Sequence, residues 1–169
     1  MSSAQQEVLI SSPYFLPDQA FCDEVSWLTR QGVRVAVVTN SLASNNSAIA
    51  HTGYKWWRRP LIEAGAELDG LRMDAELADS YRTAPIVPNR LGLHSKAIVV
   101  DRRHVYIGSA NLDRRSLSVN TELGIIAEGE GIANSLFDLI SRDMLPENSW
   151  RLTLNENNAL VWTNSEGVT

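Results

Sequence analysis

Apolar residues in this chain gather in short continuous runs, separated by segments with helical spacing. The nearly continuous β-branched run at residues 33–39 is typical of a strand buried on both faces, and further strands are predicted at residues 7–12 and 67–73. Between them, the spacing of the apolar positions predicts helices at 18–31 and 48–64, and Gly32 and Gly65 end these helices. The apolar positions of the first helix are Ala20, Phe21, Val25, Trp27 and Leu28.

The second half of the chain has two strand patterns in direct succession. It predicts strands at 93–100 and 105–108, a further run at 121–127, a helix at 131–144, and strand-like runs at 150–154 and 160–163. Alternating strands and helices predict an α/β domain, and the successive strands make its sheet mixed instead of all parallel. We therefore expect a mixed β-sheet flanked by helices, in a single domain spanning residues 1–169.

Prolines interrupt this pattern in two places. Pro60 lies inside the second predicted helix, where a missing backbone N–H costs about 3 kcal/mol. We expect a kink there, or a restart of the helix with Pro60 in its first turn. Residues 74–92 contain Pro85 and Pro88 and have no clear period, so they predict a long irregular loop.

The charge and the single cysteine limit the classes of function. The net charge is −5, so no overall basic field attracts a nucleic acid, and we expect no nucleic-acid partner. Cys22 excludes an internal disulfide and lies at an apolar helix position, so we expect a small core residue. The N-terminal residues lack the pattern of a signal peptide, and no apolar run reaches the roughly 18 residues of a membrane span.

Candidate chemistry is concentrated in the stretch LHSKAIVVDRRHVYIGSAN. Its spaced polar and small residues are His94, Lys96, Asp101, Gly108, Ser109 and Asn111. Because residues i and i+2 of a strand project from the same face, His94 and Lys96 should point together. An imidazole beside an ammonium suits a phosphate ester, since lysine supplies charge and histidine can attack phosphorus or move a proton.

The remaining members of this motif end the neighbouring predicted strand. Gly108 permits close backbone approach, and the Ser109 hydroxyl and Asn111 carboxamide can donate to phosphate oxygens. Asp101 lies an odd number of residues from His94 and Lys96, so it should face away from them. We expect a structural ion pair for Asp101, with Arg102, Arg103 or Arg114 as the candidates.

The stretch resembles the HKD motif of the phospholipase D superfamily. The resemblance covers nearly the whole chain, because SPYFLPD, the loop TNSLASNN and GSANLDRRSLSVNTELG are similar to the C-terminal half of bacterial cardiolipin synthases, and most of all to their type C subgroup. The resemblance implies that two HKD motifs meet at one pocket. One histidine forms a covalent phosphohistidine, and the other protonates the departing alcohol, without metal or other cofactor.

This resemblance also assigns roles to individual residues. It implies catalytic roles for His94 and Lys96, phosphate binding by Lys96, Ser109 and Asn111, and structural roles for Asp101 and Gly108. Glu122 matches the acidic residue that orients a histidine ring. In two-motif enzymes the first-half histidine is usually the nucleophile, so the resemblance favours the general acid as the role of His94 and leaves the nucleophile as the alternative.

The chain has one H-x-K pattern, because His51 is followed by Gly53 and His104 by Tyr106 at the second position. We expect it to be the C-terminal half of a longer two-motif phosphatidyltransferase, which moves a phosphatidyl group between phospholipids. The alternatives are a homodimeric single-motif phosphodiesterase or nuclease, and an inactive isolated half-domain. The expected partners are a phospholipid substrate and a second HKD half.

Two further groups of residues are candidates for binding. Trp56, Lys55 and Arg59 lie off the helical stripe formed by Ala50, Tyr54, Trp57 and Leu61, and they can contact lipid headgroups or simply be solvated. We expect the protein to be cytoplasmic, or peripheral at a bacterial inner membrane if these residues contact lipid. Polar residues after the second strand either line a headgroup pocket or form an ordinary loop: Asn40, Ser41, Asn45 and Asn46.

Overall fold

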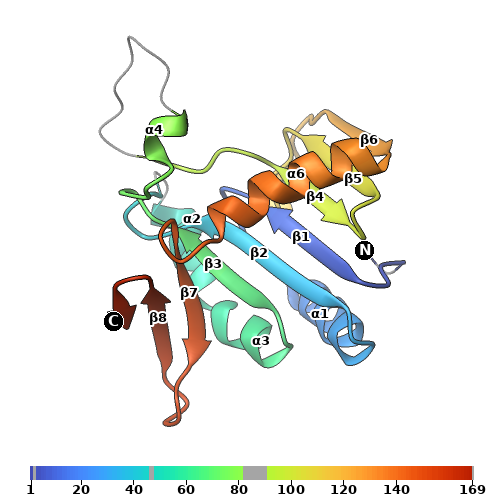
Figure 1. Cartoon of the computed structure of the whole chain (residues 1–169). Helices are drawn as coiled ribbons and strands as arrows, with labels where there is room; N and C mark the ends of the chain where they lie inside the picture. Colours follow the sequence, from blue (N-terminus) through green and yellow to red (C-terminus); the bar gives the residue numbers. More distant parts are fainter. Residues whose placement is uncertain (2, 46–47, 82–90, 169) are drawn as a thin grey trace.

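A mixed sheet forms the centre of the protein, as the computed structural model describes it for residues 1, 3–45, 48–81 and 91–168 (Figure 1). Among these residues the sheet has nine strands in the order β6-β5-β4-β1-β2-β3-β7-β8-β9. The strands are β1 (Glu7–Ser11), β2 (Arg34–Asn40), β3 (Glu67–Leu71), β4 (Ala97–Val100), β5 (His104–Gly108), β6 (Gly124–Glu128), β7 (Ser149–Leu154), β8 (Leu160–Asn164) and β9 (Gly167–Val168). β1, β2 and β3 run parallel, and the other neighbours pair antiparallel, which confirms the predicted mixed sheet.

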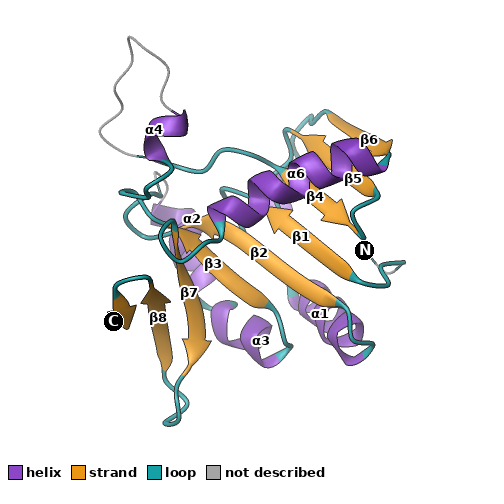
Figure 2. Ribbon diagram, viewed as in Figure 1, coloured by secondary structure: helices purple, strands orange, loops and turns teal. Residues whose placement is uncertain are grey.

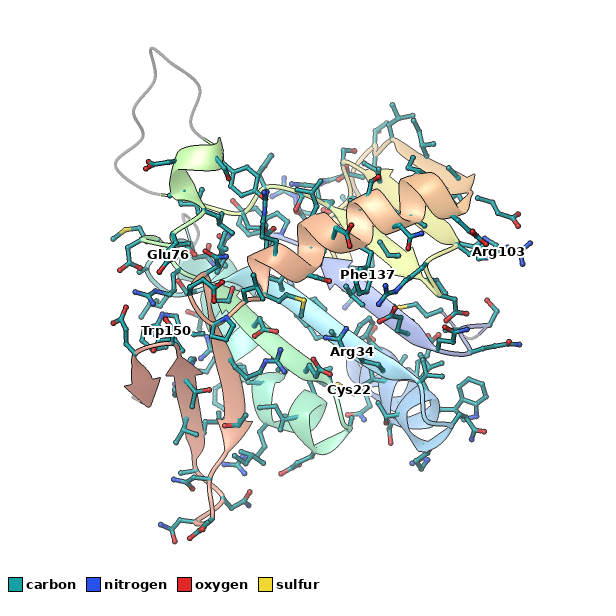
Figure 3. The ribbon with its side chains drawn as sticks, viewed as in Figure 1. Cys22, Arg34, Glu76, Arg103, Phe137 and Trp150 are labelled. Atoms are coloured by element: carbon teal, nitrogen blue, oxygen red, sulfur yellow. The ribbon has the colours of Figure 1, made fainter. Side chains whose placement is uncertain are left out.

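Helices cover both faces of this sheet. The helices are α1 (Gln19–Arg30), α2 (Ala48–Lys55), α3 (Arg58–Glu63), α4 (Ala78–Tyr81), α5 (Arg114–Ser118) and α6 (Glu130–Asp143). α6 lies across one face, and α1 and α3 lie on the opposite face (Figure 2). Phe137 points from α6 toward the sheet (Figure 3), where it packs with Leu9 and Val38. On the other face, Val25 and Leu28 of α1 pack in a second core.

The first helix forms as predicted, and two of its apolar positions are exposed. The Asp18 carboxylate accepts a hydrogen bond from the Phe21 N–H and so caps the start of α1. Cys22 is buried as predicted, and burial raises the pKa of its thiol to about 11. Ala20 is exposed and Trp27 is 45% exposed, because the buried stripe of α1 consists of Cys22, Val25 and Leu28.

The second predicted helix is divided in two, and Pro60 lies in the first turn of α3 as the restart alternative requires. An early position tolerates proline because the first N–H groups of a helix have no partner within it. Tyr54 and Leu61 are buried on the predicted core stripe, with Trp57 packed partly against them. The side chain of Ala50, the residue Asn46 and residues 82–90 with Pro85 and Pro88 lie outside what the structure describes.

Three details of the second half differ from the prediction. The fourth strand begins at Ala97 instead of residue 93, because its partner β1 ends at Ser11, and Pro13 soon follows without an N–H to continue the ladder. Short helices α4 and α5 were not predicted. Asp113 caps α5 by accepting from the Ser116 N–H, a local signal that the apolar periodicity does not reveal.

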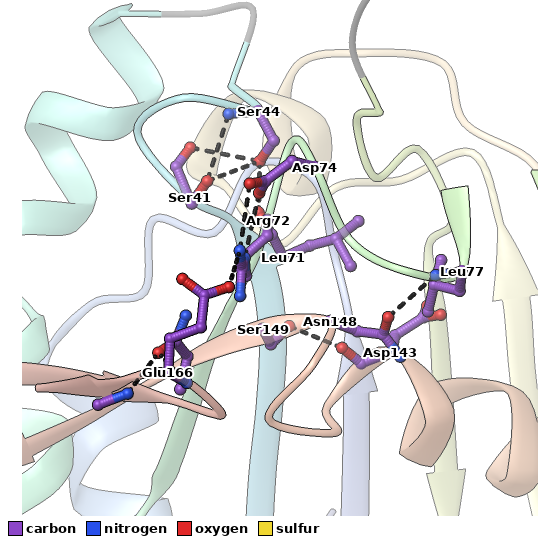
Figure 4. Close-up of polar contacts among 12 residues, drawn as sticks. Ser41, Ser44, Leu71, Arg72, Asp74, Leu77, Asp143, Asn148, Ser149 and Glu166 are labelled. Carbon is purple, nitrogen blue, oxygen red and sulfur yellow. Dashed lines mark hydrogen bonds and ion pairs between the residues drawn. The ribbon is translucent and has the colours of Figure 1, made fainter. Parts of the chain in front are cut away.

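The C-terminal strands are held against the loops that follow β2 and β3 (Figure 4). The Ser44 hydroxyl donates to the Leu71 carbonyl oxygen at 2.8 Å. The guanidinium of Arg72 binds Asp74 on one side and Glu166, beyond β8, on the other. The Asn148 side chain accepts from the Leu77 N–H at 3.1 Å. These hydrogen bonds and ion pairs therefore join the loops at the carboxyl ends of the parallel strands to one another.

Candidate active site

The segment before β4 carries His94 across the carboxyl end of the parallel strands. The Asn40 amide, at the end of β2, donates to the Leu93 carbonyl oxygen at 3.1 Å and accepts from the Leu93 N–H at 2.8 Å. It also donates to the Pro13 carbonyl oxygen at 3.3 Å. Asn40 therefore has a fixed structural position, and it sets the position of the residue directly before His94.

His94 and Lys96 are in contact, as predicted, although both precede the strand. Lys96 Nζ lies 3.4 Å from each ring nitrogen of His94 and donates to the His94 carbonyl oxygen at 2.8 Å. Lys96 is buried while His94 is exposed. Burial lowers the pKa of Lys96, and the negative charge of Glu122 acts in the opposite direction. The pair offers an ammonium and an imidazole to one small volume.

The end of β5 lies beside Lys96 because the Gly108 N–H donates to the Lys96 carbonyl oxygen at 3.0 Å. A Cβ on Gly108 would lie 2.3 Å from the Tyr106 hydroxyl and 2.7 Å from the Leu123 carbonyl oxygen. The backbone approach predicted for Gly108 is therefore real. It brings Ser109, the next residue, to the same edge.

Ser109 and Glu122 form a second pair at this edge. The Ser109 hydroxyl donates to the Glu122 carboxylate and accepts from the Leu123 N–H at 3.0 Å. Hydrogen bonds from Ser109 and then Asn120 lower the pKa of Glu122. No hydrogen bond joins Glu122 to His94 among the described residues. The role implied for Glu122, which is to orient the histidine ring, is therefore not supported by a direct contact between the two side chains.

Asn111 makes no hydrogen bond to His94 or Lys96 among the described residues. Its amide donates to the Ser116 hydroxyl at 3.4 Å, and its buried Oδ1 has no partner within the described part of the chain. Ser116 also helps to lower the pKa of Glu122, so it lies between the two side chains. Sequence reasoning missed Ser116. The sequence signal that could have located Ser116 is its spacing from Asp113, which is typical of a helix N-cap.

The Asp101 prediction was right about its direction and wrong about its partner. Its carboxylate accepts from the backbone N–H groups of Gln5, Gln6 and Glu7, at 2.9, 2.8 and 3.0 Å. Burial alone would raise the pKa of Asp101, but these hydrogen bonds outweigh it and lower the pKa.

The arginines proposed for Asp101 have other partners. Arg102 binds Glu7, and Arg103 binds Glu128. Among the described residues, no ion pair joins Asp101 to either of them or to Arg114. The reason is positional, because the turn at Asp101 faces the start of β1, where backbone N–H groups are available. Asp101 therefore fastens the start of β1 to the β4–β5 turn.

His94 and Lys96 line two different cavities, which share Ala97 as a wall residue. His94 lines a cavity of about 490 Å³ whose walls are mainly aliphatic, with Leu71, Leu91, Leu93, Leu136, Leu139 and Ile140 among them. Lys96 lines a smaller one of about 230 Å³ together with Ser11, Ser12 and Tyr106. The described residues contain no group of three His, Cys, Asp or Glu side chains arranged to hold a metal ion.

This arrangement has counterparts among known proteins. Residues 1–144 match the family model described as cardiolipin synthase, PLD-like domain. Cardiolipin synthase C of Escherichia coli is 35% identical over 163 residues, which are 96% of this chain and 34% of the relative. Cardiolipin synthase 2 of Staphylococcus epidermidis is 30% identical, over 85% of this chain and 26% of the relative. The chain thus spans about a third of the length of these relatives.

Solved structures support the same fold. The phospholipase D family member Nuc from Salmonella typhimurium matches with a TM-score of 0.58 at 16% identity, over 83% of this chain and 78% of that one. Phosphatidylserine synthase from Haemophilus influenzae matches with a TM-score of 0.63 at 16% identity, over 88% of this chain and 34% of that one. Since the family model covers most of the sequence, the chain belongs to the cardiolipin synthase family of phospholipase D-like domains.

Proposed function

We propose that this chain is one half of a phosphatidyltransferase, which moves a phosphatidyl group from one phospholipid to the hydroxyl of another. The observation that carries the proposal is the contact of Lys96 Nζ with the ring of His94, which lines a cavity with aliphatic walls. The ammonium attracts the phosphate, and the cavity accepts apolar parts of a lipid. Membership of the cardiolipin synthase family supports the same reaction class.

In this mechanism His94 acts as general acid or as nucleophile. As the acid, it gives its proton to the departing alcohol while the partner histidine bonds to phosphorus. As the nucleophile, its ring nitrogen forms the bond to phosphorus as the ester P–O bond breaks. The hydroxyl oxygen of the acceptor alcohol then bonds to phosphorus, and the P–N bond to His94 breaks. Lys96 holds the phosphate oxygens and Asn111 adds a hydrogen bond, and Ser109 does so when its single hydroxyl proton turns from Glu122 to the phosphate. Glu122 accepts from Ser109 and so fixes the hydroxyl beside Lys96.

Two observations favour a lipid over a nucleic acid as the substrate. The walls of the cavity at His94 include Leu136, Leu139 and Ile140, which suit a glycerolipid better than a charged backbone. The net charge of −5 opposes a polyanion. A homodimeric phosphodiesterase or nuclease is the second candidate function, because the chain also matches Nuc over most of that protein's length.

We propose that a second H-x-K half docks on the β6 edge of the sheet. β6 pairs only with β5 among the described strands, and Leu123, Ile125 and Ile126 are 78%, 67% and 81% exposed. This surface is continuous with the site, since Leu123 is hydrogen bonded to Ser109. An aliphatic edge strand open to solvent is an aggregation hazard, so a permanent cover is expected.

Peripheral contact with a membrane is part of the proposal. Trp56 is 73% exposed, with the Lys55 ammonium 5.9 Å from its ring centroid. Arg59 contributes less than the sequence suggested, because it binds Glu63 and the Asn158 carbonyl oxygen. No helix in the described part of the chain has the length and apolar character needed to cross a bilayer.

The proposal is tested by phosphatidyl transfer in vesicles of phosphatidylglycerol, using the full product of the native reading frame. His94→Asn should reduce the rate at least 1000-fold, because it removes the proton carrier or nucleophile. His104→Asn is the matched control. His104 is exposed, lies at the opposite end of β5 and should leave the rate unchanged.

Three results would point elsewhere. Retention of a tenth or more of the activity in His94→Asn contradicts a catalytic His94. Hydrolysis of DNA without lipid turnover favours the nuclease alternative. Absence of both activities, in a protein with intact stability, favours an inactive half-domain.

A further inference from the structure

A buried carboxylate lies in the wall of the cavity that His94 lines. Asp143, the last residue of α6, is 5% exposed and borders the same volume of about 490 Å³. Tyr81, the last residue of α4, lines it as well. The other walls that α6 provides are aliphatic: Leu136, Leu139 and Ile140. A charged group buried beside such side chains costs free energy unless hydrogen-bond donors surround it.

The position of this carboxylate is fixed by the segment before β7 and by Tyr81. The Ser149 hydroxyl donates to the Asp143 carbonyl oxygen at 2.6 Å (Figure 4), and the Asn148 amide donates to the Arg142 carbonyl oxygen at 2.9 Å. The Tyr81 hydroxyl donates to Oδ1 of Asp143 at 2.7 Å. The end of α6 is therefore held in place, and one carboxylate oxygen has a donor.

The second carboxylate oxygen is available to a ligand. No residue that the structure describes donates to Oδ2 of Asp143. Burial raises the pKa of Asp143, whereas the hydrogen bond from Tyr81 and the charge of Arg142 act in the opposite direction. Carboxylate oxygens accept hydrogen bonds from O–H and N–H groups, so a ligand with such a donor would stabilise the buried charge. The cavity therefore suits a substrate that carries a hydroxyl or an ammonium group.

Arg142 favours the hydroxyl over the ammonium. Its guanidinium donates to the Tyr81 hydroxyl at 3.2 Å, and its central carbon lies 5.4 Å from the Tyr81 ring centroid. A cation therefore already stands beside the Asp143–Tyr81 pair. A second cation would be repelled by Arg142, whereas a neutral hydroxyl would not. The aliphatic walls suit the C–H groups of an alcohol.

We propose that Asp143 accepts a hydrogen bond from a second hydroxyl of the alcohol that reacts at His94, so that this cavity selects alcohols with more than one hydroxyl group. Tyr81 is a positioning residue, because it holds Oδ1 and leaves Oδ2 to the substrate. The inference rests on the proposed function with His94 as general acid, since the alcohol then lies in the cavity that His94 lines. Asp143 binds the alcohol and takes no part in bond making.

The test is phosphatidyl transfer from vesicles of phosphatidylglycerol to labelled glycerol or labelled 1-propanol, using the full product of the native reading frame. The two alcohols have the same carbon chain and differ in their hydroxyl groups. Wild type should favour glycerol in kcat/KM at least tenfold, because 1-propanol leaves Oδ2 of Asp143 without a donor. Asp143→Asn should reduce this preference at least tenfold, because the amide still offers an oxygen to Tyr81 but presents N–H groups to the substrate.

Asp138→Asn is the matched control. Asp138 lies on the same helix, is exposed and does not line the cavity, so its substitution should leave the preference unchanged. Tyr81→Phe should reduce the preference about threefold, because Oδ1 then loses its donor. A general structural defect would lower the rates with both alcohols and leave their ratio intact.

Four results would overturn the inference. These are a wild type without preference for glycerol, an equal preference in Asp143→Asn and Asp138→Asn, and a preference for 2-aminoethanol over glycerol that Asp143→Asn removes. If Asp143→Asn does not fold, an unchanged preference in Tyr81→Phe is the fourth.

These outcomes are distinct from failure of the proposed function. Transfer to both alcohols at equal rates overturns the selection by Asp143 and leaves phosphatidyl transfer at His94 standing. Absence of transfer to either alcohol contradicts the proposed function, and the inference fails with it. His94→Asn should lower the rates with both alcohols alike, whereas Asp143→Asn should change their ratio.

Discussion

The centre of the sheet and its β6 edge have similar sequences and opposite environments. Val8, Leu9 and Ile10 of β1 are 0% exposed, whereas Ile125 and Ile126 of β6 are 67% and 81% exposed. Both runs are aliphatic, and both form strands. The difference is that α1 and α6 cover the central strands from two sides, while the edge strand has no neighbour beyond it among the described residues (Figure 2). An aliphatic pattern thus indicates that a strand is suited to burial, but it does not identify the element or partner that buries it.

The first way to break this comparison is to truncate one aliphatic side chain in each region. Leu28→Ala, in the fully buried stripe of α1, should lower the free energy of unfolding by about 2–5 kcal/mol, because it leaves a cavity in packed core. Ile126→Ala should change it by less than about 0.5 kcal/mol. Urea denaturation of the isolated chain measures both. A loss above about 2 kcal/mol in Ile126→Ala would show that the edge is already packed against something.

The second prediction adds a charge to the same edge. Ile126→Lys should weaken association with a second H-x-K half, or with a second copy of the chain, at least tenfold, because the interface would bury an unpaired ammonium. Sedimentation measures self-association, and phosphatidyl transfer by the full protein measures pairing within it. Trp27→Lys is the control, because Trp27 is 45% exposed on α1, away from the β6 edge. Equal effects of the two substitutions would contradict a specific interface.

The extent of sequence prediction differs between the same two regions. Strands and helices of the centre followed from apolar spacing, because most apolar positions there are buried by the chain itself. The positions of His94, Lys96 and Gly108 followed from motif spacing. The partner of Asp101 did not, because the backbone N–H groups of Gln5, Gln6 and Glu7 carry no side-chain signal. Asn40 and Ser41, which the sequence offered as pocket residues, do line a cavity, but its other walls, Tyr54, Trp150 and Trp162, come from separate elements and were not predicted.

The third prediction concerns the link between the two regions. Asp101 fastens the start of β1 to the β4–β5 turn, and Asp101→Asn should lower the free energy of unfolding by about 1 kcal/mol near neutral pH. The pKa of Asp101 is lower in the folded protein than in the unfolded chain, so the carboxylate stabilises the fold above about pH 4. That contribution is lost as the pH falls through the lowered pKa.

The measurement is the stability of wild type and Asp101→Asn across the acid range. The two curves should converge as the pH falls below about 4, since the protonated wild type then resembles the amide. A constant difference down to about pH 2 would contradict a role for the charge and leave only the shape of the side chain.

The smallest expected effect separates a contiguous aliphatic patch from a single exposed aromatic residue. Trp56 is 73% exposed beside Lys55, outside the β6 edge, so it has no part in the proposed docking surface. An isolated indole next to a cation suits the headgroup layer of a membrane, where the ring packs among the polar groups. Trp56→Ala should weaken binding to anionic vesicles by a factor of about three to ten, without changing self-association or the free energy of unfolding.

Lys55→Gln should weaken vesicle binding by a similar factor only at low salt, because the contribution of Lys55 is electrostatic and is screened. Unchanged vesicle binding in Trp56→Ala would assign the membrane contact to another surface. Loss of self-association in the same variant would extend the docking surface to α2 and remove the distinction between the two kinds of exposed apolar residue.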